Sequence, residues 1–374
     1  MSERKLASVQ KIVSIEDIHF QNEKGETEVA ANIVKVGVLG WSCVTQRSNG
    51  FKVGDLVCYF EVDSLLPAKP EFEFLRKKPE ETQFRLKTIK LKGQIAQGLV
   101  LPLSVITKVF NSTLKSDCSI EEYNFIEGMD LTNQLGVEKY EPEIPAHLRG
   151  LVKGQFPWFL TKTDETRIQT CPNVLIKHKG KRFVITEKVD GSSITVYSYP
   201  NSSNLPIEDP TKEHQFGVCS RNLNLSFSED NAFWKAAILL NLEEKLAKLN
   251  KPIAIQGELI GPGVNKNTLK RKELEVRWFH AYDPILKKYY DHVSMMELFA
   301  ELGLTTVPVL DDNFILDHTV EQLVTYSTGF STLNTNEKIL REGIVLKSYT
   351  EEYEKALGRL SFKVINPSWL IKYD

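Results

Sequence analysis

Cysteine is scarce in this chain, and its five copies are scattered. They are Cys43, Cys58, Cys118, Cys171 and Cys219, and they form neither a Cys-x-x-Cys pair nor a cluster with histidine. An odd number of widely spaced cysteines argues against a disulfide framework, and the missing pairs argue against a structural zinc site. The pattern predicts a reducing, intracellular setting, either cytoplasmic or nuclear.

Long hydrophobic runs and an excess of one charge are missing as well. No apolar stretch reaches membrane-spanning length, and the start, Met1-Ser-Glu-Arg-Lys5, does not resemble a signal peptide, so no membrane partner is predicted. The 47 Lys and Arg residues are nearly balanced by 49 Asp and Glu residues, which gives a net charge of −2. Any surface that binds nucleic acid must therefore be local.

Length and composition predict more than one folded core. A chain of 374 residues exceeds the usual single domain, and a hydrophobic content of 41% is enough to fill sizeable cores. Residues 1–110 are rich in short β-runs, which are Ala30–Leu39, Asp55–Val62, Phe84–Lys92 and Gln97–Leu101, punctuated by Gly40, Gly50, Gly54 and Gly93. Short strands with turn signals and little helix predict a small β-barrel.

One run of this barrel is strongly cationic. Arg85, Lys87, Lys90 and Lys92 crowd the segment Phe84–Lys92. A cationic strand on a small barrel can follow a phosphate backbone, so these four residues are candidates for binding nucleic acid. The alternative is a solvated edge strand whose lysines prevent pairing with another chain.

The middle of the chain has weaker patterns. Residues 111–155 show no clear periodicity and carry acidic patches, so we interpret them as a connector with little regular structure. The next segment, Phe156–Gln169, is typical of a loop followed by a short helix that Thr163 or Asp164 caps. Core helices are predicted at Phe233–Leu249 and at Val293–Leu302, the second stopped by Gly303.

The most informative segment is Lys188-Val-Asp190-Gly191, at the end of the apolar run that starts at Phe183. A lysine in this place can lose its proton and attack a phosphorus atom, and a carboxylate two residues later can help to hold a metal. The alternative is a β-hairpin with an Asp-Gly turn and a solvated lysine.

Further along, isolated charges stand on apolar strands in a fixed order. The segments are Ser220-Arg221-Asn222, Gln256-Gly-Glu258-Leu259, Phe279-His-Ala-Tyr282-Asp283, Arg341-Glu342-Gly-Ile-Val345-Leu-Lys347 and Leu360-Ser-Phe-Lys363-Val-Ile365. Strand alternation predicts that Glu258 shares a face with Gln256 and Ala254, and that Lys363 shares one with Ser361 and Ile365. It places Glu342 with Ile344 and Leu346, opposite Val345 and Lys347. Such charges must be paired, bound to metal or exposed at a cleft, and the alternative for each is a strand-end charge that reaches solvent.

This order of segments resembles motifs I, Ia, III, IIIa, IV and V of the covalent nucleotidyltransferases, which include ATP-dependent ligases and mRNA-capping guanylyltransferases. The chain is most similar to ATP-dependent RNA ligases of the RNA ligase 5 (Naegleria-type) branch, in which an N-terminal OB domain precedes the nucleotidyltransferase domain. Four more stretches resemble that branch, namely Val53–Phe60, Leu91–Gly98, Lys162–Gln169 and Phe362–Asn366. Because the chain ends at Asp374, eleven residues after Lys363, we expect no C-terminal OB domain.

The resemblance implies an α+β fold with three parts. Residues 1–110 would form an OB-like β-barrel that binds nucleic acid, 111–155 the connector, and 156–374 a nucleotidyltransferase (ATP-grasp-like ligase) domain of antiparallel sheets flanked by helices. It also implies ATP as the substrate that leaves covalent AMP on the enzyme, Mg²⁺ or Mn²⁺ as the metal, and a monomeric protein. The nucleic acid would be RNA with 3′-hydroxyl and 5′-phosphate ends, in the form of a nicked duplex.

The roles that the resemblance implies are as follows. Lys188 would be the nucleophile that carries AMP, and Glu187, Arg221 and Glu258 would contact the nucleotide. The adenine would be enclosed by Tyr282 and Val345, and the α-phosphate would be bound by Lys347 and Lys363. The metal would be surrounded by Asp190, Glu258 and Glu342. Burial and the metal would depress the pKa of Lys188. One departure is Lys363-Val-Ile365, because some relatives carry Lys-x-Lys at this place.

Two other functions remain open on the sequence. The same motifs could serve a DNA ligase or a guanylyltransferase, although both are expected to carry a C-terminal OB domain. The chain could also be a nucleic-acid-binding protein with a decayed transferase domain, although Lys188, Glu258, Glu342 and Lys363 are all present. Labelling with ATP or GTP distinguishes the first pair of functions, and covalent attachment of AMP decides the second.

Overall fold

The computed structural model describes residues 4–115, 117–119, 121–141, 150–334 and 336–373. The chain divides into two compact units. The first consists of Met1–Pro142, Ile168–Val174 and Leu370–Asp374, and the second of Glu143–Arg167 and Leu175–Trp369. No helix in the described part of the chain is long and apolar enough to cross a membrane.

Short β-strands dominate the first unit, as the sequence predicts. The strands are β1 (Ala7–Gln21), β2 (Thr27–Val38), β3 (Trp41–Gln46), β4 (Leu56–Phe60), β5 (Ser64–Pro67), β6 (Gln83–Arg85), β7 (Ile89–Leu91), β8 (Gln94–Ala96), β9 (Leu99–Pro102) and β10 (Glu138–Lys139), and the helices are α1 (Leu103–Leu114) and α2 (Thr132–Leu135). They form sheets in the orders β3-β2-β1-β4-β9, β10-β5-β6 and β7-β8. The inner strand β4 is buried on both faces: Val57 and Tyr59 join one apolar cluster, and Cys58 and Phe60 the other.

Residues 111–155 do not form the connector that the sequence predicts. Tyr123, Phe125, Leu131, Leu135 and Val137 pack in the same apolar cluster as the core of the barrel. Helix α1 also extends across the expected boundary at residue 110. The aromatic and aliphatic residues here follow no helical or strand period, so their burial could not be inferred locally. Residues 142–149 of this segment lie outside the described residues.

The first unit also includes a piece of chain from far downstream. The Thr170 hydroxyl donates to the Glu61 carboxylate at 2.9 Å, and the amide of Gly40 donates to the carbonyl of Gln169 at 2.8 Å. A domain boundary at residue 156 therefore cuts through a packed unit, and a protein truncated there would expose these surfaces.

The expected cationic strand Phe84–Lys92 is two strands in different sheets. β6 pairs with β5, whereas β7 pairs with β8 through a turn at Lys92 and Gly93, both of which have positive φ. Arg85 pairs with Asp63 at 2.7 Å. Because the run is interrupted at residues 86–88, its four cations do not follow one strand.

The second unit contains two sheets. Its strands are β11 (Val152–Gln155), β12 (Thr166–Arg167), β13 (Arg182–Lys188), β14 (Ser192–Pro200), β15 (His214–Cys219), β16 (Leu223–Leu225), β17 (Ile253–Ile260), β18 (Glu275–Asp283), β19 (Lys288–Tyr289), β20 (Val309–Ile315), β21 (Gly343–Ser348) and β22 (Ser361–Ile365). The orders are β11-β16-β15-β14-β17-β18-β19 and β12-β22-β21-β13-β20, and all pairs are antiparallel except β12 with β22. The α+β class is confirmed.

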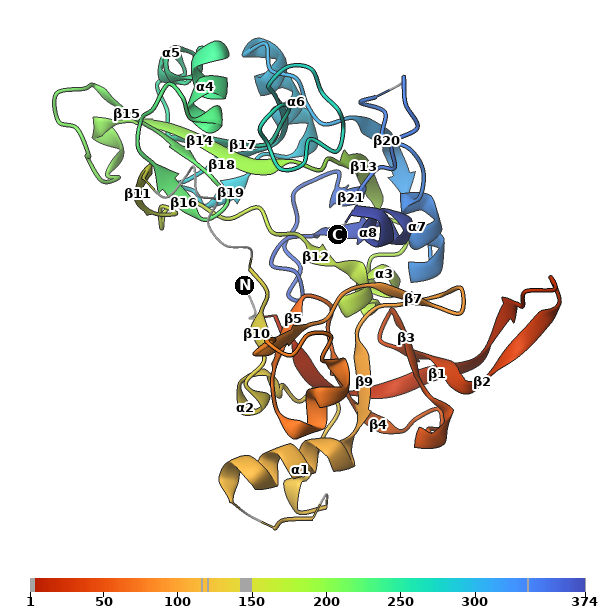
Figure 1. Ribbon diagram of the computed structural model, residues 1–374. Helices are drawn as coiled ribbons and strands as arrows, with labels where there is room; N and C mark the ends of the chain where they lie inside the picture. The colour runs from red at the N-terminus through yellow and green to blue at the C-terminus, as the bar shows by residue number, and fades with distance from the viewer. Residues whose placement is uncertain (1–3, 116, 120, 142–149, 335, 374) are drawn as a thin grey trace. The chain divides into compact units, whose positions relative to one another are not determined.

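Helices pack against one face of the seven-stranded sheet. The helices from residue 173 onwards are α3 (Asn173–Lys177), α4 (Ala232–Leu239), α5 (Leu242–Lys248), α6 (His292–Glu301), α7 (Val320–Ser327) and α8 (Pro367–Tyr373). Figure 1 shows α4, α5 and α6 beside β14 and β17, and their apolar residues share a core with Ile253 and Ile255. The helix predicted at Phe233–Leu249 breaks at Asn241, which has a left-handed conformation, whereas the one at Val293–Leu302 is confirmed.

Candidate active site

The register of the five-stranded sheet brings most of the expected site residues to one face. The directly opposed pairs are Lys188 with Gly343, Thr186 with Val345, Val184 with Lys347, and Val345 with Lys363. Opposed residues point to the same side of a sheet. Lys188, Val345, Lys347 and Lys363 therefore share one face, although up to 175 positions separate them in the sequence.

Lys188 is held by a carboxylate. Its Nζ donates to Glu342 Oε2 at 2.6 Å, and the side chains of Lys188 and Glu342 are 25% and 13% exposed. The sequence predicts Glu342 on the opposite face, with Ile344 and Leu346. That prediction is wrong because β21 begins only at Gly343, so strand alternation does not fix the direction of the Glu342 side chain.

The expected depression of the Lys188 pKa is also not found. Burial lowers the pKa of this lysine, but the carboxylates of Glu342, Glu258 and Asp190 outweigh burial and raise it. In this state Lys188 is an ammonium ion. It must lose its proton before it can act as a nucleophile.

Two glycines allow the backbone to close around Lys188. A Cβ on Gly191 would collide with the carbonyl oxygen of Leu259, and one on Gly343 would collide with that of Val364. Since neither obstacle is the end of a flexible side chain, both positions require glycine. The glycine in the Lys-Val-Asp-Gly motif thus permits β17, which carries Glu258, to approach the motif.

The carboxylates near Lys188 carry excess negative charge. Burial raises the pKa of Glu258 to about 8; Lys188 partly opposes this shift, and Glu342 and Asp190 add to it. As predicted, Glu258 lies on the strand face of Gln256 and Ala254, opposite Ile253 and Ile255, which lie in the helix-covered core. A cation in addition to Lys188 would relieve the repulsion among these three groups.

These groups fit a hydrated cation better than a closed protein cage. Among the described residues, no three His, Cys, Asp or Glu side chains converge closely enough to hold a metal on their own. Mg²⁺ usually keeps several waters and takes few protein ligands, and Mn²⁺ accepts the same oxygen donors. Asp190, Glu258 and Glu342 could hold such an ion through its waters.

A cluster of positive charge lies beside this acidic cluster. Burial, together with Lys188, Arg167 and Arg221, lowers the pKa of Lys363 to about 8, although Asp164 opposes the shift. Asp164 accepts from Arg221 at 2.9 Å and from Lys363 at 3.3 Å. The helix cap expected at Asp164 is therefore wrong, and this carboxylate belongs to the site, which sequence reasoning missed. The only signal was its place in the family-like stretch Lys162–Gln169.

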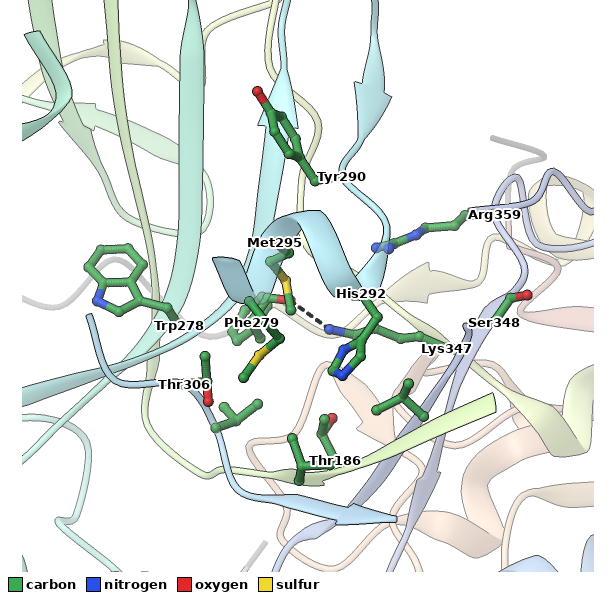
Figure 2. Close-up of a pocket in the computed structure, with 14 residues that line it drawn as sticks. Thr186, Trp278, Phe279, Tyr290, His292, Met295, Thr306, Lys347, Ser348 and Arg359 are labelled. Carbon is green, nitrogen blue, oxygen red and sulfur yellow. Dashed lines mark hydrogen bonds between the residues drawn. The ribbon is translucent and has the colours of Figure 1, made fainter. Parts of the chain in front are cut away.

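Lys347 extends into a cavity that Figure 2 shows. The cavity is lined by Thr186, Phe279, His292, Met295, Lys347 and Arg359, among other residues. Lys347 Nζ donates to the Phe279 carbonyl at 2.7 Å and lies 5.5 Å from the centroid of its ring. Burial and the nearby Arg359 lower the pKa of Lys347 to about 7, and Glu165 and Glu351 oppose this shift. The cavity combines an aromatic wall with polar groups, but its volume of about 20 Å³ has room for little more than one water molecule.

Two residues that are expected to contact the nucleotide, Tyr282 and Glu187, do not line this cavity. Tyr282 is 4% exposed and packs with Tyr197, Tyr199 and Tyr289, away from the cavity lining. The Glu187 carboxylate, on the opposite face of β13 from Lys188, accepts bonds from Ser331 and Thr332. On the same strand, Trp278 and Phe279 are the aromatic residues that line the cavity, and Phe279 is the more exposed of the two.

The cationic candidates of the first unit have separate environments. The Arg85 guanidinium lies 3.8 Å from the ring centroid of Tyr140, and Lys92 Nζ lies 4.1 Å from that of Phe20. Lys87, Lys90 and Lys92 are exposed. Arg85 therefore contributes to the fold, and of the four cations the three lysines are the exposed ones.

Comparison with known proteins agrees with this arrangement. An OB-fold domain model matches residues 6–103, and an RNA ligase model matches residues 181–365. No match was found among curated protein sequences. The structure is similar to that of the Naegleria gruberi RNA ligase with pyrophosphate, at 33% identity and a TM-score of 0.80. Variants of that enzyme with AMP and Mn and with ATP and Mn match at 32% identity, with TM-scores of 0.81 and 0.80.

The matches extend over the whole molecule. Each of these three comparisons covers 99% of this chain and 99% of the other chain. The expected order, an OB fold followed by a nucleotidyltransferase fold, is confirmed. The chain belongs to the RNA ligase family.

Proposed function

We propose that this protein is an ATP-dependent RNA ligase that joins a 3′-hydroxyl end to a 5′-phosphate end, with Lys188 as the nucleophile. The observation that carries the proposal is that Lys188 binds the Glu342 carboxylate at 2.6 Å and interacts with Lys363, which shares Asp164 with Arg221. The amine would attack the α-phosphorus of ATP, form an N–P bond and release pyrophosphate. The Naegleria gruberi enzyme, solved with ATP and Mn, with AMP and Mn, and with pyrophosphate, supports this assignment.

The charged residues around Lys188 could bind the phosphates of ATP and hold a metal ion, both of which this step requires. Lys363 and Arg221 would neutralise the negative charge of the phosphates, and Asp190, Glu258 and Glu342 would hold a hydrated Mg²⁺ or Mn²⁺. The metal would supply charge that stabilises the transition state. With its carboxylates engaged in this way, Lys188 would lose the partners that raise its pKa, so its ammonium proton would leave more readily.

The nucleotide base would lie next to Val345 and an aromatic ring. Val345 points to the same side of the sheet as Lys188, and Phe279 provides the ring at the nearby cavity. Phe279 is in this respect a better candidate than Tyr282, which is buried in another cluster. Lys347, which also lines this cavity, would contact the nucleotide.

Two further steps would complete the joining reaction. AMP would move from Lys188 to the 5′-phosphate of RNA, and a 3′-hydroxyl would then attack that phosphate, form the phosphodiester bond and release AMP. A nick in duplex RNA presents both ends together, so we propose it as the substrate. Monomeric protein would suffice, because both clusters lie within one chain.

Two assays test the reaction. Intact-mass analysis after incubation with ATP and magnesium should show one added AMP, and none with GTP; a GMP adduct would instead indicate a guanylyltransferase, and no adduct a decayed domain. Sealing of nicked duplexes that differ only in RNA or DNA sugars on the 3′-hydroxyl side separates an RNA ligase from a DNA ligase. Equal sealing of both would contradict the RNA assignment.

The surface lysines of the first unit would bind the RNA backbone. Reversal of Lys87 and Lys90 to glutamate in the full-length protein should weaken sealing and reduce the salt dependence of RNA binding by about one unit of slope per lost contact. Formation of the AMP adduct should not change. A matched reversal of the exposed Lys248 is the control, and an equal effect there would remove the barrel lysines from the RNA surface.

A further inference from the structure

Asp164 connects two of the cations that are assigned to phosphate. One of its oxygens accepts from Arg221 at 2.9 Å and the other from Lys363 at 3.3 Å. The side chains of Asp164, Arg221 and Lys363 are 39%, 54% and 19% exposed. A ligand from solvent can therefore reach all three groups.

The backbone around Asp164 is fixed to both sheets of the second unit. Gln256 on β17 donates to the carbonyl of Thr161 at 2.6 Å, and the hydroxyls of Thr163 and Ser193 lie 2.8 Å apart. On the other side, Thr166–Arg167 pairs with Phe362–Lys363. The carboxylate is thus held at these cations by the fold, and it can leave them only by rotating its side chain.

Asp164 is one carboxylate shared by two cations, Arg221 and Lys363. Burial lowers the pKa of Lys363, and Lys188, Arg167 and Arg221 add to that effect, whereas Asp164 opposes it. Such a cluster favours an anion with more than one charge over a single carboxylate. Pyrophosphate, the leaving group of the proposed first step, is an anion of this kind.

We propose that Asp164 is an internal competitor for the polyphosphate chain, which occupies Arg221 and Lys363 whenever phosphate does not, and thereby weakens the binding of pyrophosphate. This inference rests on the proposed function. Return of the carboxylate to the two cations would favour departure of the leaving group and oppose the reverse reaction, in which pyrophosphate attacks the lysyl-AMP bond and re-forms ATP.

The energies are compatible with rapid exchange. A partly exposed ion pair contributes about 1 kcal/mol or less, so phosphate can displace the carboxylate. Removal of the Asp164 charge should eliminate both the competing pair and the repulsion between this carboxylate and the bound anion. The two effects together should change the affinity about tenfold, which corresponds to about 1.4 kcal/mol.

Direct binding of inorganic pyrophosphate to the full-length protein, with magnesium and without nucleotide, tests the inference. Asp164→Asn keeps the shape of the side chain and should lower the Kd for pyrophosphate about tenfold. Asp164→Glu keeps the charge and should stay near wild type. Asp17→Asn is the matched control, because it removes another partly exposed Asp–Arg pair of 2.8 Å in the first unit. It should leave the Kd unchanged.

The opposite result has a distinct meaning. If Asp164 only positions the two cations, Asp164→Asn will bind pyrophosphate equally well or more weakly, and the inference is wrong. The same variant should also show stronger inhibition of AMP-adduct formation by pyrophosphate. The adduct on wild type reports on the proposed function separately: if it is absent, that function fails, whereas a normal adduct with an unchanged Kd in Asp164→Asn contradicts only the competitor role.

Discussion

Two lysines on one face of the same sheet have opposite electrostatic environments. Lys188 faces three carboxylates, which raise its pKa, whereas Lys347 faces the Phe279 carbonyl and Arg359 in a cavity that lowers its pKa to about 7. Both lysines are largely buried. Burial lowers the pKa of both lysines, so the difference between them comes from the charged residues that other segments place around each one.

The contrast has a consequence for catalysis. On pKa alone, Lys347 would be the better nucleophile at neutral pH, because more of it is the free amine. Lys188 lies among the carboxylates and cations that are proposed to hold the metal and the phosphates, whereas the charged groups at Lys347 are Arg359, Glu165 and Glu351. We infer that the position of the phosphorus atom, and not the resting pKa, selects the nucleophile.

The sharpest test of this comparison is to ask which lysine carries AMP. Lys188→Ala should abolish the adduct, and Lys188→Arg should do the same because arginine does not lose its proton at working pH. Lys347→Met should still form the adduct on Lys188, although more slowly. Peptide mapping of the adduct provides the measurement. An adduct of wild-type yield on Lys188→Ala would reverse the assignment of the two lysines.

The next largest effect is expected for the carboxylates near Lys188. Glu342→Ala and Glu258→Ala should each slow sealing about a hundredfold, the usual scale for loss of one preorganised electrostatic contact. Single-turnover rates at saturating ATP measure this loss. Glu301→Ala, a change of the same type at an exposed helix residue, is the control. A near wild-type rate for either variant would make that residue a strand-end charge without a role in the chemistry.

A smaller effect, on the binding of ATP, is expected for the aromatic residues near Lys347. Loss of a stacking ring costs about 1–3 kcal/mol per base, so Phe279→Ala should raise the KM for ATP roughly tenfold or more with a smaller change in kcat. Tyr282→Leu should raise it less, because Tyr282 packs in a different cluster. Steady-state kinetics of adduct formation distinguish the two. A larger KM effect for Tyr282→Leu, at equal thermal stability, would return the stacking role to Tyr282.

The residue pattern within a single strand predicts which face of that strand a side chain occupies. The faces of Glu258 on β17 and of Lys363 on β22 follow from alternation within each strand, and both predictions agree with the structure. Glu342 was misplaced because alternation was extended one residue beyond the start of β21.

Features of the site and the fold that depend on contacts between distant segments do not follow from the sequence pattern. The raised pKa of Lys188 comes from three carboxylates on segments up to 154 residues away. Asp164 has an ordinary helix-cap pattern, and only its pairing with Arg221 and Lys363, on two other segments, reveals its place in the site. Similarly, the run Phe84–Lys92 has no local signal that assigns its halves to different sheets, apart from the turn at Lys92 and Gly93.

The last expected effect concerns stability. The pKa of Lys347 is lowered in the folded protein from its ordinary 10.5 to about 7. Between these two values the unfolded chain holds a proton that the folded protein has lost, so this lysine makes the free energy of unfolding rise with pH across the window. Below about pH 7 both states are protonated and the unfavourable contribution is constant. Other groups that face Lys347 are Arg359, Glu165, Glu351 and His292.

Lys347→Met isolates this contribution, because methionine is apolar and two methionines already line the cavity. The difference in unfolding free energy, wild type minus variant, should increase as pH rises from about 7 towards 10.5, by up to about 1.4 kcal/mol per pH unit. Thermal or urea unfolding of both proteins at several pH values measures it. A difference that is flat or that decreases with pH would mean that Lys347 stays charged in the folded protein. The two lysines would then share one protonation state, and the contrast between their environments would have no energetic consequence.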